Sequence, residues 1–102
     1  MTVRTEYYDD SSNNIARALG FRDYATMRAR AKLVCGQRNP DWGDARLFVA
    51  RTPHGNAVAW QERGDHLQMG AREYPTLRDA LAAQSERCRQ LPKDRQWPWI
   101  IG

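Results

Sequence analysis

Residues 46–72 read RLFVARTPHGNAVAWQERGDHLQMGAR, and this stretch decides the fold. Apolar and polar side chains alternate along three short segments of it, which is the period of a β-strand with one buried face. Turn-forming residues separate the segments at 52–55 (TPHG) and at 63–65 (RGD). Pro presets the backbone for a tight turn, and Gly tolerates conformations that other residues avoid. The stretch therefore predicts a three-stranded antiparallel sheet.

One face of this predicted sheet is apolar and needs a cover, because a small sheet with an exposed apolar face is unstable in water. We expect that face to consist of Leu47, Val49, Val58, Trp60, Leu67, Met69 and Ala71.

Residues 76–91 are predicted to form the helix that covers this face. Thr76 has the side chain of an N-cap, and Asp79 follows three residues later, where a capping partner belongs. Pro92 ends the helix, because it cannot continue the backbone hydrogen bonds. The apolar stripe of the helix consists of Leu77, Ala80, Leu81, Cys88 and Leu91. Gln84 interrupts this stripe.

Two helices are expected before the sheet, within residues 7–36. The first is short, because cap-forming residues at 9–14 precede it and Gly20 ends it. Asp23 is predicted to cap the second helix, which spans residues 24–35. Its apolar stripe consists of Tyr24, Met27, Ala31, Val34 and Cys35. The expected fold class is therefore α+β, with an N-terminal helical pair, a three-stranded antiparallel sheet and a C-terminal helix packed on the sheet.

Length and composition indicate one cytoplasmic domain. A chain of 102 residues can bury a single modest core, so residues 1–102 are expected to form a single domain. The first ten residues lack the apolar run of a signal peptide, and no segment approaches the roughly 20 apolar residues of a membrane span. Cys35 and Cys88 lie far apart in the sequence, and we expect both to be reduced.

The sequence contains no recognisable metal-binding or phosphate-binding motif of the kind that enzymes use. Its two histidines, His54 and His66, and its two cysteines lack the close spacing of metal ligands. The seven glycines are dispersed, so no glycine-rich phosphate loop is present. We therefore expect no enzyme activity, no metal and no cofactor.

Side chains that typically dominate protein interfaces are abundant. The chain contains four Trp and four Tyr, and most of its 16 basic residues are Arg. The formal net charge of +4 favours an acidic partner. Our leading hypothesis is a non-enzymatic protein that binds a larger protein or ribonucleoprotein and inhibits or adapts it. The expected contact residues are Trp42, Trp97, Trp99, Arg28, Arg30, Arg87 and Arg89. Small α+β chains of this kind are similar to phage or mobile-element inhibitors such as anti-CRISPR proteins.

A small DNA-binding module or transcriptional regulator is the alternative. Residues 15–21 (IARALGF) resemble the first half of a helix-turn-helix, in which small residues let two helices cross closely. That resemblance implies contacts from the following helix to a DNA groove or to phosphates, and the outer face of the sheet could serve instead. The expected contact residues are Arg22, Arg28, Arg30 and Lys32.

The C-terminal residues 97–101 (WPWII) are too apolar for a free tail. We expect them to dock on the body of the protein or on its partner. The sequence does not distinguish these two roles, and it leaves the oligomeric state open.

Overall fold

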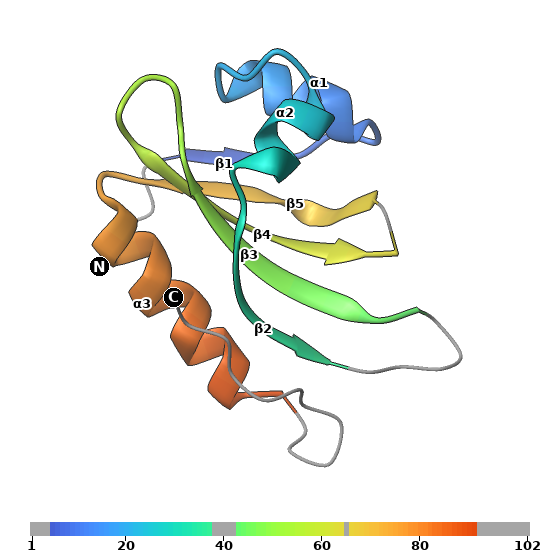
Figure 1. Cartoon of the computed structure of the whole chain (residues 1–102), viewed down its shortest axis with the longest axis vertical. Coiled ribbons are helices and arrows are strands. Elements are labelled where there is room, and N and C mark those ends of the chain that lie inside the picture. Colours follow the sequence, from blue (N-terminus) through green and yellow to red (C-terminus); the bar gives the residue numbers. More distant parts are fainter. Residues whose placement is uncertain (1–4, 38–42, 65, 92–102) are drawn as a thin grey trace.

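The computed structural model describes residues 5–37, 43–64 and 66–91. Within them the elements follow in the order β1 (Thr5–Tyr7), α1 (Ser12–Ala18), α2 (Tyr24–Ala29), β2 (Lys32–Gln37), β3 (Ala45–Arg51), β4 (Ala57–Arg63), β5 (His66–Tyr74) and α3 (Leu77–Arg89). Figure 1 shows α1 and α2 together beside one face of the sheet, whereas α3 crosses the other face. The predicted α+β class and the C-terminal helix packed on the sheet are confirmed.

The sheet has more strands than the sequence predicted. In the described residues five strands are ordered β1-β5-β4-β3-β2, and every neighbouring pair is antiparallel. The three predicted strands are β3, β4 and β5, and the first predicted turn connects β3 to β4. In the second predicted turn, Arg63 belongs to β4 and Asp65 lies outside the described residues. In the first turn the Thr52 amide donates to the Asn56 carbonyl oxygen (2.9 Å), and Gly55 has a φ of +89°. The predicted number of strands was wrong, because β1 and β2 extend the sheet on its two sides.

The prediction of a helix over residues 24–35 was wrong beyond Ala29. The helix α2 ends there, and residues 32–37 form β2, which pairs with β3. Val34 and Cys35 fit a helical stripe, but a short apolar run fits a buried strand equally well. A short isolated helix is unstable in water, so the backbone pairing and burial available beside β3 decide in favour of the strand.

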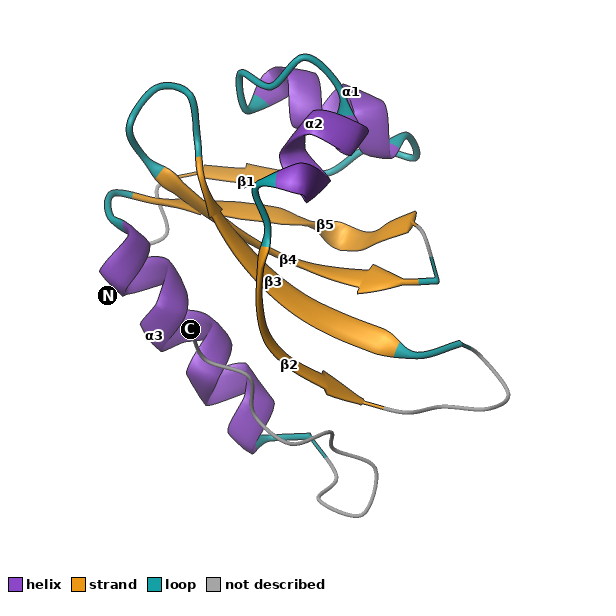
Figure 2. Cartoon of the chain, viewed as in Figure 1, coloured by secondary structure: helices purple, strands orange, loops and turns teal. Residues whose placement is uncertain are grey.

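Both faces of the sheet are buried, and Figure 2 shows helices on both sides of it. The register of β3 and β4 pairs Phe48 with Trp60, and their face packs against α1 and α2. Leu47 and Val49 face α3 instead, so their placement on the same face as Trp60 was wrong. The reason is the register, which the turn sets, because a shift of one residue exchanges the two faces of a strand.

The remaining described members of the predicted apolar face do pack on the Trp60 side. They are Val58, Leu67 and Ala71. The side chain of Met69 lies outside the described residues.

A β-bulge in β2 turns Cys35 toward α3. Val34 is the extra residue between the pairs that Leu33 and Cys35 make with β3. The extra residue reverses the face of the residues after it, so Cys35 meets α3 and forms a disulfide with Cys88. Both cysteines are at most 1% exposed. The expectation of two reduced cysteines was therefore wrong, because their distance in the sequence does not reveal the bulge that brings them together.

The predicted N-caps of α2 and α3 and the predicted end of α1 are confirmed, whereas Pro92, the predicted end of α3, lies outside the described residues. The side chain of Asp23 accepts a hydrogen bond from the Thr26 amide (2.8 Å), and Thr76 accepts one from the Asp79 amide (3.1 Å). Gly20 follows α1 with a φ of +96°. None of the helices in the described part of the chain is long and apolar enough to cross a membrane.

Gln84, which interrupts the apolar stripe of α3, ties this helix to the sheet. The side chain is buried, and its Nε2 donates to the carbonyl oxygens of Phe48 and Trp60 at 2.8 Å each. Its Oε1 is buried and accepts no hydrogen bond from the described residues. The polar residue in the stripe is therefore a backbone contact that joins α3 to β3 and β4.

Candidate functional site

A hollow of about 790 Å³ opens where α1 and α2 approach the ends of β4 and β5. We call it the Arg28 hollow, and its lining includes Asp10, Ser12, Tyr24, Arg28, Glu62 and Leu67. These residues come from the segment before α1, from both N-terminal helices and from the strands β4 and β5. The fold therefore gathers polar side chains that are far apart in the sequence.

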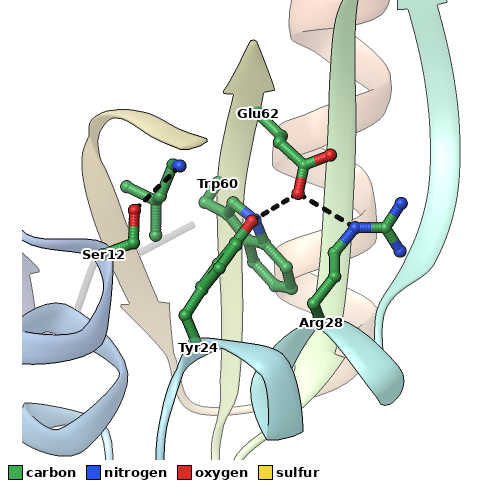
Figure 3. A network of polar contacts seen from close by, with 6 residues as sticks. Ser12, Tyr24, Arg28, Trp60 and Glu62 are labelled. Atoms are coloured by element: carbon green, nitrogen blue, oxygen red, sulfur yellow. Dashed lines mark hydrogen bonds and ion pairs between the residues drawn. The ribbon is translucent and has the colours of Figure 1, made fainter. Parts of the chain in front are cut away.

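A chain of hydrogen bonds runs along one wall of the Arg28 hollow (Figure 3). The indole Nε1 of Trp60 donates to the Tyr24 hydroxyl (2.9 Å), and this hydroxyl donates to Glu62 Oε2 (2.6 Å). The Nε of Arg28 donates to the same Oε2 at 2.9 Å. The Glu62 side chain is only 5% exposed, so its charge is balanced by Arg28 and its oxygen is further stabilised by the hydrogen bond from the neutral Tyr24 hydroxyl.

The chemistry of this wall favours binding over proton transfer. Burial raises the pKa of the Tyr24 phenol well above its usual range, and the hydrogen bond to Glu62 raises it further. Tyr24 therefore keeps its proton at neutral pH and acts as a donor. Glu62 Oε2 already accepts hydrogen bonds from the Tyr24 hydroxyl and from Arg28 Nε. What these groups do is hold Arg28 in place.

The guanidinium of Arg28 is fixed on two sides. Its Nε is bound to Glu62, and its Cζ lies 4.0 Å from the centre of the Phe48 ring. The side chain remains 40% exposed, and Figure 3 shows its two terminal nitrogens directed away from Glu62. Arg28 was predicted as a contact residue in both functional hypotheses, but the sequence did not indicate Glu62 as its partner.

A signal for Glu62 does exist in the sequence. In β4 the residues Val58 and Trp60 alternate on one buried face, and Glu62 is the next residue in that alternation. A carboxylate in such a position either ends the strand or meets a buried cation. The alternation could therefore have identified Glu62 as half of an ion pair.

A second depression, of about 440 Å³, lies between the end of β3 and the start of α3. We call it the cationic groove, and it is lined by Arg30, Lys32, Val49, Ala50, Arg51 and Leu77. Arg30 is the C-cap of α2, Lys32 begins β2 and Arg51 ends β3. The structure thus brings two predicted contact residues together with Arg51, which the sequence did not single out.

The other predicted contact residues are dispersed. Arg22 is exposed between α1 and α2, on neither the groove nor the hollow. Arg87 is half-buried on α3, where it donates to Gln61 Oε1 (2.9 Å) and burial lowers the pKa of its guanidinium. Arg89 is 64% exposed and pairs with Glu86 on the helix surface.

Trp42, Trp97 and Trp99 lie outside the described residues, and so do residues 97–101 that were expected to dock. The hypotheses about them stay predictions.

Within residues 5–37, 43–64 and 66–91, no group of three or more His, Cys, Asp or Glu side chains is placed to hold a metal ion.

No protein-family model matches the chain, and neither a curated protein nor a solved structure shows significant similarity to it. Proposals about function therefore depend on the geometry of the two sites.

Proposed function

We propose that this chain acts by binding a larger protein partner through the cationic groove, and that it blocks or adapts that partner without catalysis. The observation that supports this proposal is the convergence of Arg30, Lys32 and Arg51 around one small depression. None of the described residues that line the groove is acidic. Its charge therefore complements an acidic partner, in line with the net charge of +4.

The floor of the groove favours a polypeptide over a polyphosphate. Leu77 is partly exposed beside the cationic side chains and offers apolar surface that a phosphate backbone does not use, whereas Val49 and Ala50 are buried. Exposed ion pairs alone contribute little, roughly 0–1 kcal/mol each, so apolar contact has to supply part of the affinity. A segment that combines Asp or Glu with one large apolar residue satisfies both requirements.

Nucleic acid is the second candidate partner, because Arg30 and Lys32 of the predicted DNA contacts lie together in the groove. Nucleic acid is the less favoured partner because the other two predicted DNA contacts, Arg22 and Arg28, do not line the groove. Arg28 is bound to Glu62, and Arg22 is exposed elsewhere. A continuous cationic surface along a duplex requires more than this one cluster.

Selection from a random peptide library tests the proposal without knowledge of the native partner. Peptides that bind the chain are expected to contain Asp or Glu beside Leu, Ile or Phe. The Arg30→Glu/Arg51→Glu variant is expected to bind the selected peptides about tenfold more weakly by fluorescence anisotropy.

Arg17→Glu/Arg89→Glu is the matched control, because it changes the net charge equally at two exposed positions. Arg89 lies twelve residues along α3 from Leu77, the one residue of α3 that lines the groove, so the two backbone positions are about 18 Å apart. Equal loss of binding in both variants would show that net charge, and not the groove, controls binding. Sub-micromolar binding of random duplex DNA with a steep salt dependence would place nucleic acid first.

A further inference from the structure

The Arg28 hollow contains a buried ionic network that stability alone does not explain. Moving the Glu62 carboxylate out of water is costly, and its bonds to Tyr24 and Arg28 offset that cost only in part. An apolar residue at this position would avoid the cost altogether. Ion pairs of this kind beside an open hollow are more typical of ligand sites than of cores, and about 790 Å³ suits a small molecule.

Arg28 presents one edge of its guanidinium in a fixed orientation. Neither of its η nitrogens donates a hydrogen bond to a described residue, since only its Nε is bound. Stacking on Phe48 limits rotation of the group, so little conformational entropy remains to be lost on binding. Two parallel N–H groups on this edge match the two oxygens of a carboxylate.

The segment before α1 supplies a negative charge to the same hollow. Asp10 is exposed and lines the hollow together with Ser12. Ser12 Oγ accepts a hydrogen bond from the Leu67 amide (3.0 Å), which leaves its hydroxyl proton available to a ligand. Glu62 is already balanced by Arg28, so Asp10 is the carboxylate available to a cation among the described residues that line the hollow.

We propose that the Arg28 hollow binds a small zwitterion, with the ligand carboxylate on Arg28 and the ligand ammonium group on Asp10. The two opposite charges come from different segments and both line one hollow, which matches a ligand that carries both. A phosphate fits less well, because it adds negative charge beside Asp10 and Glu62. Free amino acids and ω-amino acids have this chemistry. The site is separate from the cationic groove and does not depend on the partner proposed above.

Backbone amide shifts measured by NMR test the site with four probes of related size. These are 4-aminobutanoate, 6-aminohexanoate, butanoate and butylamine. One of the two zwitterions is expected to bind roughly tenfold more tightly than butanoate or butylamine, because it forms both ion pairs. The shifts are expected at residues around α2 and the start of β5.

Two variants assign the charges, and two others serve as controls. Arg28→Gln is expected to abolish binding of the zwitterion, and Asp10→Asn to reduce its affinity to that of butanoate. Arg22→Gln and Arg30→Glu/Arg51→Glu are expected to leave it unchanged. Asp10 is exposed, so its variant remains interpretable even where Arg28→Gln destabilises the fold. Equal binding of butanoate and the zwitterions, tighter binding of inorganic phosphate, or no response to Asp10→Asn would overturn the proposal.

Discussion

Reduction of the Cys35–Cys88 disulfide is expected to lower the free energy of unfolding by about 4 kcal/mol. The two cysteines are 53 residues apart, and closing a loop of this length removes conformational entropy from the unfolded chain worth about 4 kcal/mol at 25 °C. Domains of this size have only roughly 5–15 kcal/mol of stability in total. The bond that joins β2 to α3 is therefore a large part of what keeps the chain folded.

Urea unfolding of the oxidised and of the reduced wild-type protein measures this contribution, since both states contain the same side chains. In thermal unfolding the same loss lowers Tm by roughly 15–30 °C for a domain of about 100 residues. The Cys35→Ala/Cys88→Ala variant is the control, because its stability should not respond to the reductant.

Burial of both sulfur atoms adds a kinetic expectation. A reductant reaches the bond only when β2 and α3 separate, so reduction of the native protein should be slow and should accelerate in sub-denaturing urea. Thiol alkylation followed by mass spectrometry gives the rate.

Two results would refute this reasoning. Free thiols in protein purified under air without reductant would show that the bond does not form. A change in the free energy of unfolding below about 1 kcal/mol after complete reduction would show that the bond does not restrict the unfolded chain as argued.

Three further changes test individual contacts by urea unfolding. Gly70→Ala should lower the free energy of unfolding by roughly 1–3 kcal/mol more than Gly55→Ala does. Both glycines have positive φ, but only at Gly70 would a Cβ overlap the Tyr7 carbonyl oxygen. Equal losses in the two variants would contradict this close approach. Above about pH 10 the unfolded chain releases the Tyr24 proton while the folded chain holds it, since the folded pKa is raised, so stability should fall by up to about 1.4 kcal/mol per pH unit. Tyr24→Phe should remove that slope above about pH 10, and an unchanged slope would assign it to another group. Gln84→Glu should lower the free energy of unfolding by about 3 kcal/mol or more at neutral pH, because it replaces a donor to two carbonyl oxygens with a buried charge. This loss should become smaller in acid, where the carboxyl group is neutral.

Local sequence patterns determined the strands of the central hairpins and the starts of α2 and α3. Pro53 and Gly55 define the first turn, and the caps at Asp23 and Thr76 begin α2 and α3 as predicted. These features depend on neighbouring residues alone, because a turn or a cap is formed by side chains and backbone within a few positions. They are for that reason readable from one sequence.

The register between strands and the pairing of distant segments were decided only by the tertiary structure. Alternation shows which residues of one strand share a face, but it does not show whether Leu47 or Phe48 shares the face of Trp60. For the same reason the sequence did not predict β2. Its apolar residues fit a helix equally well, and only pairing with β3 makes this segment a strand.

The two candidate sites and the disulfide also arise from this long-range pairing. Arg28 is 34 residues from Glu62, and Cys35 is 53 residues from Cys88. The sequence alone indicated Arg28, Arg30 and Lys32 together as candidate DNA contacts. Only the packing of α2 on the sheet binds Arg28 to a buried carboxylate and leaves Arg30 and Lys32 beside the groove, because burial and neighbouring charge are properties of the folded chain.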